Sequence, residues 1–133
     1  MDRTFQKFLR SGLDLAPLGV ERRGGNLPYF CTPKGAAIFG WAGVDGIHYC
    51  FIRGFGGMVF AVSPMNAAPD CVHPLARDFA DFLRLLLACG DAAALEQAWM
   101  WGEAQFDAFL RENPPTAEQE ACLAAVAAQL GLT

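Results

Sequence analysis

Three short apolar runs, joined by glycine-rich turns, limit most strongly what this 133-residue chain can fold into. The runs are Ala36–Trp41, Ile47–Ile52 and Met58–Val62, and each contains the β-branched or aromatic residues that favour strands. The connecting segments, residues 43–46 and 54–57, contain the glycines that tight hairpin turns require. The pattern therefore predicts consecutive antiparallel strands. Because the middle run is apolar on both faces, we expect both faces to be covered, with the helices that follow supplying the cover.

A strong amphipathic helix is expected after the strands. A brief extended piece at residues 71–73 is followed by helical spacing of apolar residues over about residues 75–89, where Gly90 provides the stop. Asp81 and Arg84 lie three residues apart on the polar face of this helix. We expect them to form an ion pair.

Helices are also predicted at both ends of the chain. Phe5, Phe8 and Leu9 have the spacing of a short N-terminal helix with one buried face. Thr116 and Gln119 have the spacing of a capping box, which opens the last helix. The expected C-terminal helical segments cover residues 91–101, 102–112 and 116–131. Phe109 belongs to the helical pattern of the second segment, and Leu123 lies on the buried face of the third.

These elements predict a single α+β domain spanning residues 1–133, with an N-terminal helix, a central and mostly antiparallel sheet, and a C-terminal helical layer. With 53% hydrophobic and 18% charged residues, the composition is that of a folded chain. The longest apolar run, Phe79–Cys89, is shorter than the roughly 20 residues of a membrane span. The first residues lack the apolar core of a signal peptide, so we expect a cytoplasmic protein without a membrane partner.

Charge is divided unevenly along the chain. The net charge of −4 argues against a dedicated nucleic-acid partner, which would require a basic surface. Residues 1–66 carry seven Lys or Arg and four Asp or Glu, whereas residues 67–133 carry three and ten. The acidic half indicates either solvated helix faces or a docking surface for a basic partner.

Five cysteines, widely spaced and without a CxxC pair, predict reduced thiols packed as small apolar side chains. One alternative is a zinc site, because His48-x-Cys50 and Cys71-x-His73 would supply two thiolates and two imidazoles if their strands adjoined. The one-residue spacers differ from those of structural zinc sites. We therefore expect no metal and no cofactor.

Two catalytic interpretations have little sequence support. A nucleophile would pair Cys50 or Cys71 with a histidine and an acid such as Asp45 or Asp78, but no nucleophile motif surrounds either cysteine. The glycine-rich segment 54–57 lacks the lysine and the following helix of a phosphate-binding loop. We interpret it as a hairpin turn, and we expect no catalytic residues.

Several packing motifs lie between about residues 27 and 90, in the order loop, hairpin, strand and helix. Leu27–Pro28 precedes the sheet, Gly40–Ile47 contains a hairpin, and Gly56–Val62 forms a strand. Ala76-x-x-Phe79-x-x-Phe82-Leu83-x-x-Leu86 follows as a helix. This arrangement resembles the SUKH superfamily, which includes Smi/Knr-type regulators and many bacterial immunity proteins. The resemblance implies a non-enzymatic α+β binding domain, often encoded beside a toxin that it neutralises, and it transfers no ligand residues.

We therefore predict a protein-binding domain whose partner is a protein with a basic surface, such as a toxin domain. Trp99 and Trp101 are two residues apart and cannot share one helical face, so at least one should lie near the surface as a binding anchor. The candidate contact residues, chosen for charge or aromatic character, are Asp91, Glu96, Trp99, Trp101, Glu103 and Asp107.

Two other functions remain open at this point. One is a small-molecule binding or catalytic domain with a pocket between sheet and helices near His48, Tyr49 and Arg53. The other is a regulatory subunit that forms homodimers through Trp99 and Trp101. The sequence does not determine the oligomeric state.

Overall fold

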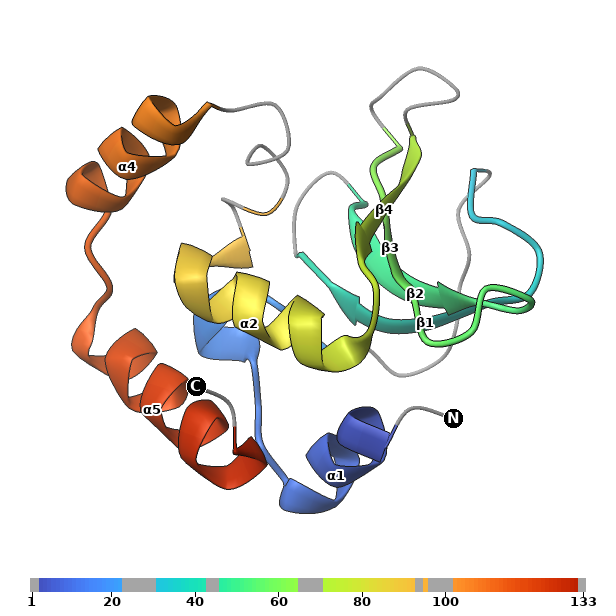
Figure 1. Ribbon diagram of the computed structural model, residues 1–133, viewed down its shortest axis with the longest axis horizontal. Coiled ribbons are helices and arrows are strands. Elements are labelled where there is room, and N and C mark those ends of the chain that lie inside the picture. Colours follow the sequence, from blue (N-terminus) through green and yellow to red (C-terminus); the bar gives the residue numbers. More distant parts are fainter. Residues whose placement is uncertain are drawn as a thin grey trace.

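The computed structural model describes residues 3–22, 31–42, 46–64, 71–92, 95 and 102–131. It confirms the predicted α+β domain, with an N-terminal helix, an antiparallel sheet and a C-terminal helical layer (Figure 1). Within these residues, no helix combines the length and the apolar character needed to cross a membrane.

The sheet contains four antiparallel strands in the order β1-β2-β3-β4. The strands are β1 (Ala36–Trp41), β2 (His48–Ile52), β3 (Val59–Val62) and β4 (Val72–Ala76). The first three match the predicted runs. The glycine-rich segment after β2 is a hairpin turn, as predicted, with the Phe55 N–H donating to the Ile52 carbonyl at 3.1 Å.

The predicted start of the strong helix, at Leu75, is wrong. Leu75 and Ala76 belong to β4, where Ala76 pairs with Val59, and helix α2 spans Phe79–Cys89. Pro74 also lies in β4. A proline is tolerated there because β4 is at the edge of the sheet, where not every N–H has to donate to a neighbouring strand.

A side-chain cap begins α2 and a glycine ends it. The Asp78 carboxylate caps its N-terminus by accepting a hydrogen bond from the Asp81 N–H at 2.8 Å. Gly90 ends the helix with a φ of 78°, as predicted.

The expected ion pair on the polar face of α2 is confirmed, with Arg84 Nη1 2.8 Å from Asp81 Oδ1, and Arg77 donates to the same carboxylate. Hydrogen bonds from Arg84 and Arg77 lower the pKa of Asp81.

Three further helices follow the sequence closely, α1 (Arg3–Ser11), α4 (Glu103–Glu112) and α5 (Ala117–Leu130). The short 3-10 helix η1 (Ala16–Leu18) was not predicted. The capping box of α5 is confirmed, because Thr116 Oγ1 accepts from the Gln119 N–H at 3.1 Å and Gln119 Oε1 accepts from the Thr116 N–H at 2.9 Å. Of the helix predicted to follow Asp91, Ala92 and Leu95 are helical and buried, and the rest lies outside the described residues.

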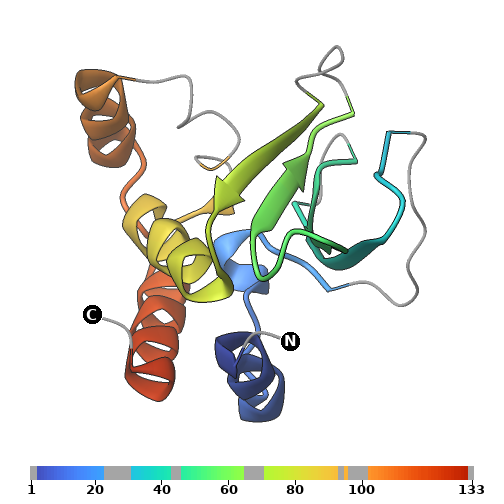
Figure 2. The same cartoon turned by 45° about the vertical axis from the view of Figure 1, so that its right-hand side comes forward.

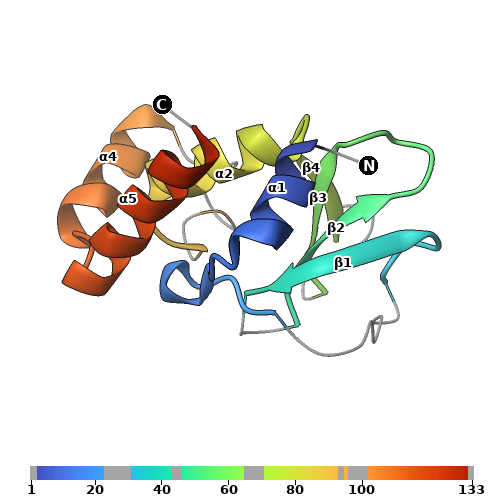
Figure 3. The ribbon, with the colours of Figure 1, turned by 90° about the horizontal axis from the view of Figure 1, so that it is seen from below.

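All of these helices lie on one side of the sheet (Figures 2 and 3). An aromatic layer joins the sheet to the helices. Phe82 of α2 is buried in it, with its ring centroid 5.3 Å from that of Phe39 and 5.5 Å from that of Tyr49. The layer consists of Phe5, Phe39, Tyr49, Phe51, Phe79 and Phe82. This interior is continuous with buried residues of α5.

The opposite face of the sheet has a smaller core, made of Cys50, Ile52, Phe60 and Val62. Partly buried residues that include Cys31 pack against it. The expectation that helices cover both faces is therefore wrong. Each strand pairs antiparallel with its sequence neighbour, and within the described residues no helix lies on this second face.

The aromatic layer generates the first prediction. Phe82→Ala should lower the free energy of unfolding by about 3–5 kcal/mol, because a fully buried ring is removed and leaves a cavity. Phe55→Ala is the matched control, since Phe55 is 54% exposed, and it should cost less than about 1 kcal/mol. Urea denaturation measures both. Equal losses would contradict the burial of Phe82 in the aromatic layer.

Candidate functional site

The residues predicted to line a small-molecule pocket do not converge. His48 and Tyr49 are neighbours in β2 and point to opposite faces of the sheet. Tyr49 is part of the aromatic layer, whereas the His48 ring stacks on Trp41 with centroids 4.6 Å apart. Arg53 is exposed beyond the far end of β2. The structure thus does not bring these three side chains together, and the aromatic layer fills the space between sheet and α2.

His48 is held by its surroundings at both ring nitrogens. Its Nδ1 donates to the Gly46 carbonyl at 2.7 Å, and its Nε2 is hydrogen-bonded to the Thr32 hydroxyl at 2.9 Å. The residue is fully buried. These contacts join the start of β2 to the segment before β1, so His48 has a structural role in this arrangement.

The zinc alternative has no site in the described part of the chain. The two His/Cys pairs are separated by β3, which lies between β2 and β4. His73 pairs with Ala61 on the face of the aromatic layer, whereas Cys50 belongs to the core on the other face. Among the described residues, no three His, Cys, Asp or Glu side chains are grouped to hold a metal ion.

The cysteines are free thiols, as predicted. Burial raises the pKa of Cys50 and of Cys89 to about 11, so both thiols are protonated at neutral pH and are poor nucleophiles. Of the acids in the nucleophile hypothesis, Asp78 caps α2, and Asp45 lies outside the described residues. This arrangement gives the catalytic interpretation no support.

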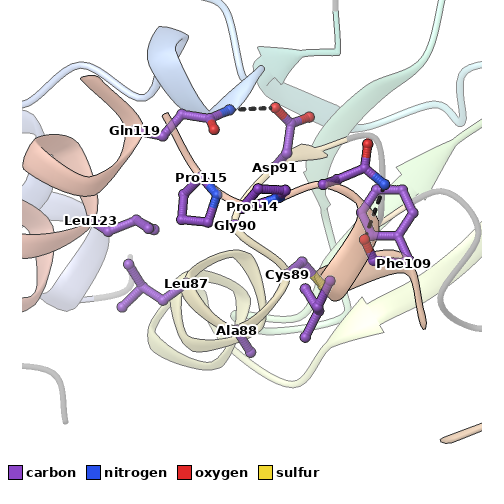
Figure 4. A pocket seen from close by; sticks show the side chains of 12 residues that line it. Leu87, Ala88, Cys89, Gly90, Asp91, Phe109, Pro114, Pro115, Gln119 and Leu123 are labelled. Carbon is purple, nitrogen blue, oxygen red and sulfur yellow. Dashed lines mark hydrogen bonds between the residues drawn. The ribbon is translucent and has the colours of Figure 1, made fainter. Parts of the chain in front are cut away.

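A groove opens on the helical side of the molecule, where the end of α2 faces α4 and α5 (Figure 4). We call it the three-helix groove, and its volume is about 520 Å³. Leu87 of α2 and Leu123 of α5 lie next to each other on one side, and Phe109 of α4 lies on the other. Pro114 and Pro115, which connect α4 to α5, complete a mostly apolar lining.

One hydrogen-bonded network crosses the polar side of the groove. Gln119 Nε2 donates to Asp91 Oδ2 at 2.9 Å, while Oε1 of the same side chain accepts from the Thr116 N–H. The capping glutamine of α5 therefore also fixes the carboxylate that follows α2. A negative charge is thereby held beside an apolar surface.

The predicted contact residues are only partly placed by the structure. Asp91 lines the three-helix groove, and Glu103 and Asp107 are exposed on α4, which forms one of its walls. Glu96, Trp99 and Trp101 lie outside the described residues.

Sequence reasoning missed the apolar part of the groove. It placed Leu123 on a buried face and gave Phe109 only as part of a helical pattern, whereas both are half-buried at the groove. Helical spacing identifies an apolar face without showing whether another element covers it. The available signal was Pro114–Pro115, which prevents α4 and α5 from forming one continuous helix.

Comparisons with protein-family models, with characterised proteins and with solved structures find no match to this chain. The resemblance to the SUKH superfamily stays a prediction. Function is therefore inferred below from the geometry and charge of the three-helix groove.

Gln119→Glu tests the network. The variant retains an oxygen that accepts from Thr116, but it places a second carboxylate against Asp91. We expect the free energy of unfolding to fall by about 1–2 kcal/mol at pH 7, and this loss to shrink as acid protonates the pair. Gln105→Glu is the control, because Gln105 caps α4 in the same way by accepting from the Gly102 N–H at 2.9 Å. The control should change stability by less than about 0.5 kcal/mol; equal losses would contradict the network.

Thiol titration tests the assignment of the cysteines. In the native protein at pH 8, Cys50 and Cys89 should resist a disulfide reagent because both are buried and their pKa values are raised to about 11. Both should react at once in denaturant. Burial favours the neutral thiol in the folded state, so the contribution of both residues to stability is complete below the ordinary thiol pKa of 9.0. It is lost as the pH rises towards their folded-state pKa of about 11. Rapid native labelling of Cys50, located by mass spectrometry, would contradict the assignment.

Proposed function

We propose that this chain is a non-enzymatic protein-binding domain that sequesters a partner with a basic surface. The carrying observation is the three-helix groove, an apolar surface bounded by the acidic helices α4 and α5. Residues 102–131 contain five Asp or Glu and one Lys or Arg. The acidic residues of this segment, all exposed, are Glu103, Asp107, Glu112, Glu118 and Glu120.

Apolar surface surrounded by charge is the usual composition of a protein-recognition site. The apolar centre contributes binding energy through burial, and the charged rim selects the partner and speeds association. The aromatic layer supports the same proposal, because it fills the interior where a substrate pocket was the alternative. Burial of His48 and Cys50 withholds two reactive side chains from the surface.

The mechanism we propose is steric occlusion after electrostatic steering. The negative potential of α4 and α5 attracts a basic partner, and apolar contacts in the groove then slow dissociation. The resemblance to immunity proteins suggests a toxin domain as this partner. No cofactor, metal, nucleic acid or membrane is part of the proposal.

Charge reversal on α4 tests the proposed function. The chain is co-expressed with the product of the adjacent gene, and association of the purified pair is followed at low and high salt. Asp107→Lys should slow association about tenfold at low ionic strength, and the difference should shrink in high salt. Glu21→Lys is the matched control, because Glu21 is also exposed but precedes β1, and it should have a much smaller effect. Failure of the two proteins to bind, or equal effects of the two variants, would overturn the proposal.

A further inference from the structure

Helix α4 carries an apolar stripe that its own chain covers only in part. Phe106, Phe109 and Leu110 have helical spacing, and each is half-buried. No residue of α4 is buried, whereas α2 has five buried residues and α5 has two. In Figures 1 and 2, α4 is the helix most distant from the sheet. Covering this stripe would bury apolar area and stabilise the bound state.

The stripe and the groove belong to one surface. Phe109 and Leu110 of α4 line the three-helix groove together with Leu87 and Leu123 of the other two helices. Its volume of about 520 Å³ is enough for several apolar side chains. An occupant would therefore contact three helices at once.

Only some occupants are compatible with such walls. The backbone N–H and C=O groups within the wall helices already form hydrogen bonds along each helix, so they cannot pair with an added β-strand. An extended peptide placed on apolar side chains would leave its own backbone groups without partners, which is costly. A helix satisfies its backbone internally and presents only side chains. The favoured occupant is therefore an α-helix that lies in the groove with its apolar face against the walls.

Charge defines the polar face of that helix. Asp91 holds a carboxylate at the groove, and Glu112 is exposed on α4 next to Asn113, which also lines the groove. A helix seated here would approach acidic groups on more than one side. Lys or Arg residues flanking its apolar stripe are the complement.

We infer that the three-helix groove binds a basic amphipathic α-helix of the partner, which packs against α2, α4 and α5 as a fourth helix. This inference rests on the proposed function and specifies its partner. The bound helix inserts apolar residues at i, i+3 or i+4 and i+7 against Leu87, Phe109 and Leu123, and its basic residues face Asp91 and the acidic rim.

The probe is a synthetic peptide of about 14 Leu and Lys residues arranged with a helical apolar stripe, about 21 Å long as a helix. The comparison peptide has the same composition in an order that distributes Leu around the helix. Fluorescence anisotropy with the full chain should show about tenfold tighter binding of the striped peptide, equivalent to 1.4 kcal/mol. Equal affinities would overturn the inference.

A blocking variant tests the location without removing a core contact. Ala88 is exposed and lines the groove, so Ala88→Trp should obstruct the site and weaken binding of the striped peptide about tenfold or more. Ala124→Trp is the matched control, because Ala124 is exposed on α5 and its substitution leaves the groove open. Circular dichroism and thermal melting verify that both variants fold. Equal binding by the two variants would overturn the inference.

The failure of this inference can be told apart from failure of the proposed function. If Asp107→Lys weakens the complex with the adjacent gene's product but Ala88→Trp does not, the acidic surface binds the partner and the helix-in-groove inference is wrong. If neither variant weakens the complex, both are wrong. Light scattering identifies a further overturning result, a dimer of this chain that Ala88→Trp dissociates, because the occupant would then be a second copy.

Discussion

The aromatic layer, which packs α2 against the sheet, is the interaction on which the rest of the molecule depends. Phe79 and Phe82, in the first turn of α2, lie in contact with rings of β1 and β2. Asp78 starts the helix at the point where the edge strand ends. The first half of α2 is thus fixed on the sheet, and its second half points away from it (Figure 1). Leu87, in the second half of α2, and Asp91, just after it, therefore lie next to α4 and α5.

Polar groups set the positions of the outer helices after the apolar core has fixed α2. Gln119 is central because one side chain completes the cap of α5 and also donates to Asp91. Its two hydrogen bonds are satisfied together only when the start of α5 faces the end of α2. The groove is therefore a consequence of a specific helix arrangement, although most of its surface is apolar.

The sequence predicts local structure well where one residue type has one physical role. Gly90 and Gly131 stop helices, Thr116 begins one, and three apolar runs bounded by glycine-rich turns define three strands. The prediction fails for Leu75 and Ala76, whose apolar character suits a helix or a strand, because the strand is set by pairing of Ala76 with Val59, far away in the sequence. It fails for the groove for the same reason. Whether Phe109 is covered depends on where α2 and α5 lie.

The distribution of charge links this architecture to a binding role. Exposed Arg3, Lys7 and Arg10 make the outer face of α1 basic, while α4 and α5 are acidic, so a small net charge conceals two regions of opposite sign. The basic partner that we propose would be attracted by the acidic region and repelled by the basic one, so the field would orient it before contact. Orientation matters here because the apolar surface that rewards contact lies between the acidic helices. Steering and burial therefore act on the same part of the molecule.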